Sequence, residues 1–150
     1  MKEPVEDALP KSVGWLGYGG LLPFVGLAVL MLTDPERRSF WGQALIAYGA
    51  VILSFVGALH WAFAMLLKEL NAAQRRHRYI WSTLPALVAW PAVLLPTHLA
   101  APMLVVGLLM HYWQDRVLTS NVSLPGWYLP LRLRLSAVAS CTLVIAALLS

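Results

Sequence analysis

The chain has 150 residues, which is enough for one domain. Hydrophobic residues make up 59% of it and charged residues only 12%, whereas a water-soluble domain needs roughly a quarter of charged residues to cover its surface. This composition excludes an ordinary soluble domain and predicts an integral membrane protein. The net charge is +4, but the basic residues lie in short loops, where they set topology and contact anionic lipid, so we expect no nucleic-acid partner.

Five apolar segments predict an all-α fold, an integral membrane bundle of five transmembrane helices in a single domain over residues 1–150. A spanning helix needs about 20 apolar residues. The first segment contains several glycines and Pro23, so we expect it to bend. Asp34 as N-cap and Pro35 at the first helical position indicate that the second helix begins near Pro35. The expected spans are residues 13–32, 41–67, 81–95, 103–118 and 131–149.

Patterns within and between these segments predict packing and turns. Residues 71–79 are expected to form a polar loop. The third span is short and carries Pro85 and Pro91, so we expect a kink or local unwinding there. Residues 96–102 are expected to form a tight hairpin, and residues 119–130 a further loop. In the second helix, small residues recur at every fourth position and predict a helix-packing face: Ala50, Ser54, Ala58 and Ala62.

The lysines and arginines divide unevenly between the two ends of the predicted bundle. Arg37 and Arg38 lie at one end, and the other nine lie at the end that holds the N-terminus: Lys2, Lys11, Lys68, Arg75, Arg76, Arg78, Arg116, Arg132 and Arg134. The positive-inside rule therefore predicts a cytoplasmic N-terminus and a C-terminus outside. Residues 1–7 mix acidic and basic side chains, unlike a signal peptide or a mitochondrial presequence, so we expect the first segment to stay as a membrane helix.

Three ionisable residues fall inside the predicted spans, where such groups are costly and are functional candidates by default. His60 lies in the second helix, and His111 and Asp115 lie four residues apart on one face of the fourth. An aspartate one turn from a histidine can hold it in one tautomer and raise its basicity. These residues, with Trp61 beside them, predict a polar site in the cytoplasmic half of the bundle.

Several interpretations of this site stay open. The histidines bond across helices and only help the bundle to pack, or they line a pocket for a small amphipathic ligand or a lipid headgroup. A third interpretation is ligation of haem b by His60 and His111 from two antiparallel helices. A fourth is catalysis on a lipid-soluble substrate, with the His111–Asp115 pair as base. Nothing in the spacing organises a metal site, and we expect none.

Basic and aromatic residues at the membrane surface add further candidates. Arg132 and Arg134 open the fifth helix, where they contact lipid phosphates or one of them pairs with Asp115. Trp127 and Tyr128 are typical of interfacial anchors, in a chain with seven tryptophans. The candidate contacts to lipid headgroups are Arg75, Arg76, Arg78 and Arg134.

Five segments of the chain resemble the transmembrane-protein-69-like family, a group of small bacterial and mitochondrial membrane proteins of unknown function. They are Trp15–Phe24 (WLGYGGLLPF), Tyr48–Trp61 (YGAVILSFVGALHW), Arg78–Trp90 (RYIWSTLPALVAW), Asp115 and Pro125–Leu135 (PGWYLPLRLRL). The most specific piece is the His60–Trp61 pair. The resemblance implies a multispan inner-membrane protein without a known activity. It draws attention to the residues around which the motifs gather: His60, Asp115, Trp127, Tyr128 and Arg132.

Together, these observations predict a non-enzymatic inner-membrane protein with a binding or accessory role beside a larger membrane complex. We expect the bacterial cytoplasmic membrane, with the mitochondrial inner membrane as the alternative. The expected partners are the lipid bilayer and a membrane complex or a second copy of the chain. No cofactor is expected, with haem b as the alternative. The candidate ligand-binding residues are His60, Trp61, His111, Asp115, Trp127, Tyr128 and Arg132.

Overall fold

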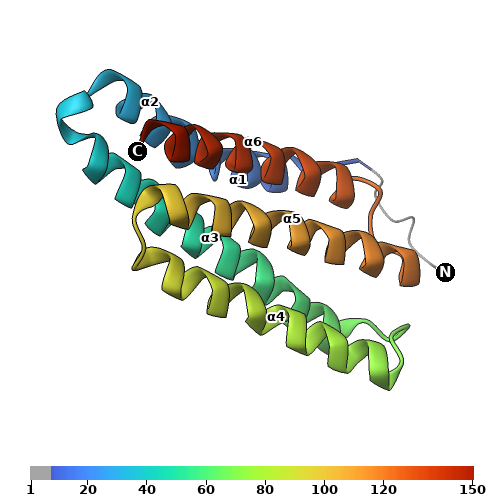
Figure 1. The fold of residues 1–150 in the computed structure, drawn as a ribbon. Coiled ribbons are helices and arrows are strands. Elements are labelled where there is room, and N and C mark those ends of the chain that lie inside the picture. Colours follow the sequence, from blue (N-terminus) through green and yellow to red (C-terminus); the bar gives the residue numbers. More distant parts are fainter. Residues whose placement is uncertain (1–7) are drawn as a thin grey trace.

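The chain folds into long helices that run up and down one bundle and are joined by short turns (Figure 1). The computed structural model describes residues 8–150, and every regular element in this part is a helix, as predicted. The predictions that rest on residues 1–7, including Lys2, lie outside the described residues. The helices are α1 (Lys11–Gly19), α2 (Leu22–Thr33), the short 3-10 turn η1 (Pro35–Arg37), α3 (Arg38–Leu66), α4 (Ala72–Val93), α5 (Thr97–Asn121) and α6 (Tyr128–Leu149).

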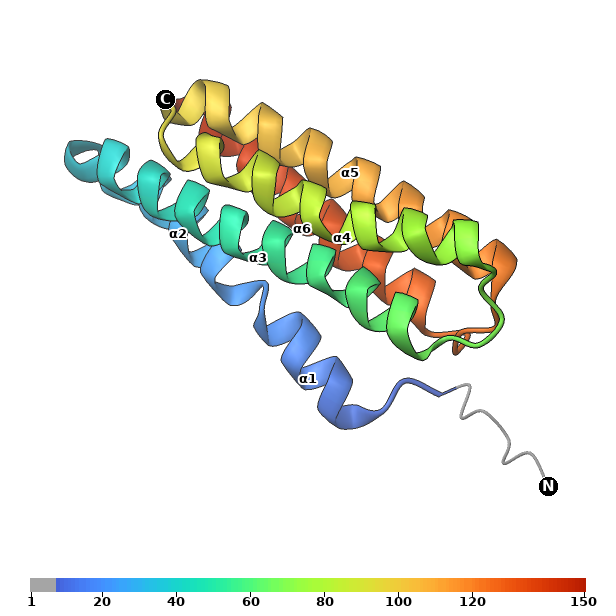
Figure 2. The ribbon, with the colours of Figure 1, turned by 90° about the horizontal axis from the view of Figure 1, so that it is seen from below.

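The first apolar segment is interrupted, which sharpens the predicted bend. Helix α1 ends at Gly19 and α2 begins at Leu22, with Pro23 in its first turn, where the missing N–H of proline is tolerated. The hydroxyl of Tyr48 on α3 donates a hydrogen bond of 2.7 Å to the carbonyl oxygen of Gly20 at the break. Figure 2 shows α2 running beside α3 while α1 diverges from the bundle.

The predicted loop over residues 71–79 is wrong, because these residues form the first turns of α4. A capping box starts the helix: the backbone N–H of Gln74 donates to the side chain of Asn71, and the backbone N–H of Asn71 donates to the side chain of Gln74. These two bonds satisfy N–H groups that a helix start otherwise leaves free. The basic residues in this stretch suggested a loop, although Asn71 and Gln74 have the spacing of a capping box.

The predicted third span, residues 81–95, is also too short. Helix α4 has 22 residues and continues through Pro85 and Pro91 without ending. The hairpin predicted over residues 96–102 is wrong, because α5 begins at Thr97 and contains Pro102. Pro102 is the sixth residue of α5, so it removes the backbone hydrogen bond that its position would otherwise make, yet the helix continues through it to Asn121.

The start of the second predicted helix near Pro35 is confirmed, although Asp34 does not cap it. No hydrogen bond joins the Asp34 side chain to the first turn. Its carboxylate instead accepts a hydrogen bond of 3.1 Å from the indole nitrogen of Trp41. The Asp34 side chain thus connects the turn to Trp41 in the first turn of α3 and does not cap the 3-10 turn.

Helix α3 is the central element, and its packing face differs from the predicted small-residue stripe. Ala50 is buried, but Ala58 and Ala62 are exposed, because each four-residue step rotates about 40° further around a helix. The close approaches occur instead at three buried glycines spaced seven and eight residues apart, which keeps them on one face. They are Gly42 against Thr97, Gly49 against Leu104 and Gly57 against Pro85.

Within residues 8–150, three helical segments are long and apolar enough to cross a membrane: Lys11–Thr33, Pro35–Leu66 and Tyr128–Leu149. Many large apolar side chains on the outside of the bundle are exposed, which suits a lipid surface. The ends of α3 and α5 and the starts of α4 and α6 meet at one end of the bundle, where most basic residues lie, whereas Arg37 and Arg38 lie at the other (Figure 1). Five spans and the sidedness of the termini stay predictions.

Gly57→Ala is expected to destabilise the bundle. A Cβ atom at Gly57 would lie 2.8 and 2.9 Å from ring atoms of Pro85 and 3.0 Å from the carbonyl oxygen of Ser82, so α3 and α4 must separate. We expect a loss of about 1–3 kcal/mol, measured as a lower Tm of the purified protein in detergent. Gly26→Ala is the control, because its Cβ would meet nothing within 4 Å. Equal Tm values for the two variants would show that the α3–α4 contact is not close.

Candidate functional site

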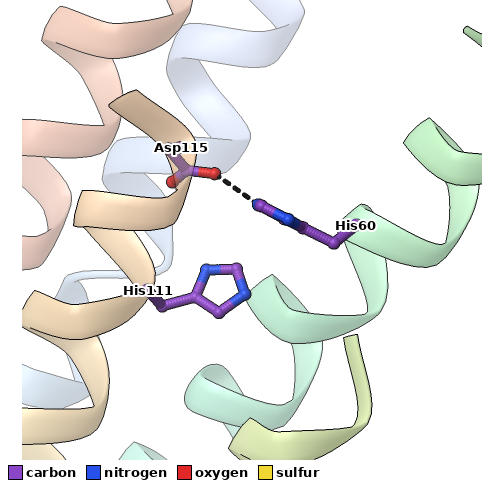
Figure 3. A group of neighbouring side chains, drawn as sticks. All are labelled: His60, His111 and Asp115. Carbon is purple, nitrogen blue, oxygen red and sulfur yellow. Dashed lines mark hydrogen bonds and ion pairs between the residues drawn. The ribbon is translucent and has the colours of Figure 1, made fainter. Parts of the chain in front are cut away.

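The site is built around Asp115, a fully buried carboxylate on α5. Its Oδ1 accepts hydrogen bonds from Nε2 of His60 on α3 (2.8 Å, drawn in Figure 3) and from the hydroxyl of Tyr128 on α6 (3.0 Å). Its Oδ2 accepts a bond of 2.7 Å from Nε of Arg132 on α6. The carboxylate therefore joins three helices. Pairing of Arg132 or Arg134 with Asp115 is one of the two sequence-based expectations for these arginines, and Arg132 does pair with it.

Arg78 extends this network from α4. Its Nη1 donates to the backbone carbonyl of Gln114 at 3.0 Å and to the side-chain oxygen of Gln114 at 3.2 Å. The same nitrogen lies 3.5 Å from Nδ1 of His60, at the long limit of a hydrogen bond. Arginine can only donate and an ionised carboxylate can only accept, so the two partners assign His60 to the neutral tautomer that carries its proton on Nε2.

The cluster carries more positive than negative charge. Arg78 and Arg132 are both buried, with exposed fractions of 3% and 6%, and Asp115 is the only buried carboxylate in residues 8–150. Because His60 is neutral in its assigned tautomer, the two guanidinium groups share one counter-charge. A buried charge without a partner is costly, so this imbalance favours an additional anionic or hydrogen-bond-accepting group near the cluster.

His111 lies beside the network but does not join it through hydrogen bonds. Its ring contacts that of His60, with centroids 4.5 Å apart and planes at 73°, and Figure 3 shows the two rings edge to face. Neither ring nitrogen has a hydrogen-bond partner in the part of the chain that the structure describes, although the residue is only 1% exposed. The prediction that His111 pairs with Asp115 is therefore wrong, because Asp115 faces His60, Tyr128 and Arg132 instead.

Three residues of the site could in principle bind a metal ion. The potential ligand atoms of His60, His111 and Asp115 lie within 4.8 Å of one another, close enough to converge on one ion. Yet both oxygens of Asp115 already accept hydrogen bonds, one of them from Arg132. A divalent cation here would add positive charge to a cluster that already has an excess of it, so the donor set fits a cation poorly.

Two of the predicted aromatic site residues lie away from Asp115. Trp61 is 49% exposed and packs edge to face on Tyr79, with centroids 4.8 Å apart. It follows His60 in the sequence, and successive helical residues point about 100° apart, so both cannot face the core. Trp127 contacts Tyr128, with ring centroids 6.4 Å apart, and belongs to the rim of the cluster.

The four arginines predicted at lipid headgroups behave differently from one another. Arg78 is buried in the cluster. Arg75 turns inward and donates to the carbonyl groups of Ala64 and Leu67 at the end of α3, and to that of Leu70 in the turn before α4. These carbonyls have no partner within the helix, so Arg75 caps it. Arg76 and Arg134 are exposed, and Arg134 donates to the hydroxyl of Tyr18 at 3.1 Å.

A cavity of about 120 Å³ lies beside the cluster and is lined by the α1–α2 segment, α3, α5 and α6. Among the residues that line it, only Arg132 and Ser136 are polar. Each has a buried atom without a hydrogen-bond partner in the described part of the chain, Nη2 of Arg132 and Oγ of Ser136. The cavity therefore combines an apolar wall with two polar residues, each of which carries a buried polar atom without a partner.

Sequence reasoning missed Gln114, Ser136 and the buried role of Arg78. Gln114 positions Arg78 and also contacts Nε2 of His77 at 3.2 Å. Ser136 follows Arg132 by four residues, so the two lie on one face of α6, and this spacing could have identified it. Nothing in the sequence distinguishes the inward Arg78 from the outward Arg76, because that depends on how α4 is rotated.

The chain matches a family model described as "Protein of unknown function (DUF3429)" over residues 9–148. It is 36% identical to Transmembrane protein 69 of Xenopus tropicalis over 143 residues, which cover 93% of this chain and 54% of that protein. It is 28% identical to Transmembrane protein 69 of Mus musculus over 143 residues, covering 93% and 57%. The chain thus spans little more than half the length of these relatives. No solved structure matches it.

Asp115→Asn is expected to destabilise the protein more than any change at an exposed acid. It leaves two buried guanidinium groups without a buried counter-charge, which costs about 3–5 kcal/mol. The measurement is thermal unfolding in detergent, with the exposed Glu69→Gln as control. In the Asp115→Asn/Arg132→Gln double variant the loss should be smaller than the sum of the single losses. An Asp115→Asn protein as stable as Glu69→Gln would contradict the network.

Arg75→Ala is expected to lower the Tm, whereas Arg76→Ala is expected to leave it unchanged. Arg75 makes charge-assisted bonds to the last carbonyls of α3, and each such bond contributes about 1.5–3 kcal/mol at most, while Arg76 is exposed. Equal Tm values for both variants would remove the capping role.

Proposed function

The chain belongs to the DUF3429 family, and we propose that it is a non-enzymatic membrane protein that binds a small ligand at the cluster around Asp115. The family membership and the apolar helices make it a membrane protein. Neither carries an activity. The proposal therefore rests on the site itself, in which polar groups are held in fixed positions beside an apolar cavity.

The observation that carries the proposal is the state of Arg132. Its Nε is hydrogen-bonded to Asp115 at 2.7 Å, so the guanidinium plane is held in place, while its Nη2 is buried and has no hydrogen-bond partner among residues 8–150. Buried polar atoms in native proteins nearly always have a hydrogen-bond partner. Because Arg132 lines the cavity, a ligand there would supply the missing acceptor. A preorganised donor of this kind loses little entropy on binding.

The location of the cluster suggests on which side of the membrane the ligand binds. Arg132, Tyr128 and Asp115 lie in the half of the bundle that holds most basic residues, which the positive-inside rule places toward the cytoplasm or the matrix. This sidedness favours a bacterial cytoplasmic membrane or a mitochondrial inner membrane. An accessory role beside a larger membrane complex stays part of the proposal, and migration on a native gel would test it.

Two other functions receive less support from the geometry. Ligation of haem b needs the histidines on opposite faces of a porphyrin, but the rings of His60 and His111 touch, 4.5 Å between centroids. Haem would fit only after the helices separate. Catalysis with a His111–Asp115 base needs contact between the two side chains, and the carboxylate is instead bonded to His60, Tyr128 and Arg132. Neither function uses the cavity.

The proposal is tested by native mass spectrometry of the full chain purified from membranes in mild detergent. We expect a non-covalent small-molecule adduct on the wild type and its loss in Arg132→Lys, which keeps a positive charge beside Asp115 but removes Nη2. Arg134→Lys is the control, because Arg134 is exposed two residues further along α6. Wild-type protein free of any adduct, or an adduct that survives Arg132→Lys, would overturn the binding role.

A further inference from the structure

We infer that the ligand is a single-chain amphiphile with an anionic head, of the long-chain carboxylate class, whose head binds Nη2 of Arg132 and Oγ of Ser136. The inference rests on the proposed function and adds to it the chemical class of the ligand and its route. Four features of the cavity support this inference: the polar pair Arg132 and Ser136, the charge of the neighbouring cluster, the volume of the cavity, and its opening to the apolar surface of the bundle.

The polar pair lies on one turn of α6. Arg132 and Ser136 are four residues apart, both line the cavity, and they are 6% and 3% exposed. Their unpartnered atoms are a guanidinium nitrogen and a hydroxyl, both of which can donate a hydrogen bond. Two donors from residues on one face of α6 match a group with two acceptor oxygens, and a carboxylate is the smallest such group.

Charge favours an anion over a neutral acceptor. The described cluster holds two buried guanidinium groups and one buried carboxylate, and His60 is neutral in its assigned tautomer. A bound carboxylate would bring the buried charges to balance. An ester or alcohol would satisfy the hydrogen bonds and leave the imbalance, so it should bind more weakly in a site that excludes water.

The size of the cavity favours a ligand whose buried part is small. Its volume of about 120 Å³ is below that of pockets for drug-sized molecules, which measure roughly 300–1,000 Å³. An engineered cavity of about 150 Å³ holds one benzene molecule. A carboxylate with the first carbons of a single chain is therefore a better fit than a phosphodiester headgroup that carries two chains. The rest of the chain would lie outside the cavity.

The mouth of the cavity opens where lipid would be. Leu16 on α1 and Phe55 on α3 both line the cavity, and they are 79% and 61% exposed, so the cavity reaches the apolar surface between these helices. Its deeper wall includes Phe24 and Leu108, which are buried. A ligand dissolved in the bilayer can thus enter head first and keep its tail among lipid chains.

The experiment measures binding of radiolabelled palmitate to the full chain in nanodiscs of phosphatidylcholine. We expect saturable binding, about tenfold weaker for Arg132→Lys and weaker for Ser136→Ala, because each removes a donor to the carboxylate. Gly17→Leu should block binding, since Gly17 lines the cavity and its Cβ would meet other side chains only at 3.5 Å or more. Arg134→Lys should bind like the wild type. Ser136→Ala, Gly17→Leu and Arg134→Lys should keep the wild-type Tm, whereas Arg132→Lys also loses the bond from Nε to Asp115 and is expected to lower it.

Competition separates the chemical classes. Unlabelled palmitate should displace the labelled palmitate. Methyl palmitate and hexadecanol should reach the same displacement only at about tenfold higher concentration. Adding phosphatidylglycerol to the nanodiscs should change the amount of bound label little. Equal competition by the ester would overturn the anionic head, and strong competition by phosphatidylglycerol would overturn the single chain. Unaltered binding in Gly17→Leu would overturn the cavity as the site. In the first two cases an adduct lost in Arg132→Lys would still support the proposed function.

Discussion

The buried carboxylate of Asp115 is the constraint on which the rest of the bundle depends. In a membrane interior a lone carboxylate is unstable, so Asp115 on α5 requires donors. The donors come from two other helices, His60 from α3 and Tyr128 and Arg132 from α6. This requirement fixes how these helices are rotated about their axes. Apolar packing alone does not fix these rotations in a bilayer, because lipid tails and leucine side chains are equally apolar.

The same carboxylate explains why two arginines can be buried. Arg132 bonds to it directly, and Arg78 is connected to it through His60. The close glycine contacts of α3 allow this, since Gly57 lets Pro85 of α4 approach and so brings Arg78, two turns earlier on α4, toward His60. Backbone proximity and the polar network are thus two parts of one arrangement.

How much of this could be predicted depends on the range of the interaction. Local patterns predicted the helices, the start of α3 near Pro35 and the placement of Asp115 one helix before Arg132. They failed where a local signal competed with another: the charges of residues 71–79 concealed a capping box, and Pro85 and Pro102 suggested breaks that packing overrides. The roles of Arg78 and Ser136 depend on the rotation of α4 and α6 against neighbours far away in the sequence, which no single segment encodes.

The break after Gly19 has a consequence for the way the bilayer acts on this protein. Helix α1 has nine residues, about 14 Å, and is attached to the bundle by few contacts, among them the bond from Arg134 to Tyr18. Its tilt is therefore set by the thickness of the surrounding lipid as much as by the protein. Because Leu16 and Gly17 form one wall of the cavity, a thinner or thicker membrane would narrow or widen the gap beside Arg132. The composition of the host membrane then becomes a determinant of which molecules reach that arginine.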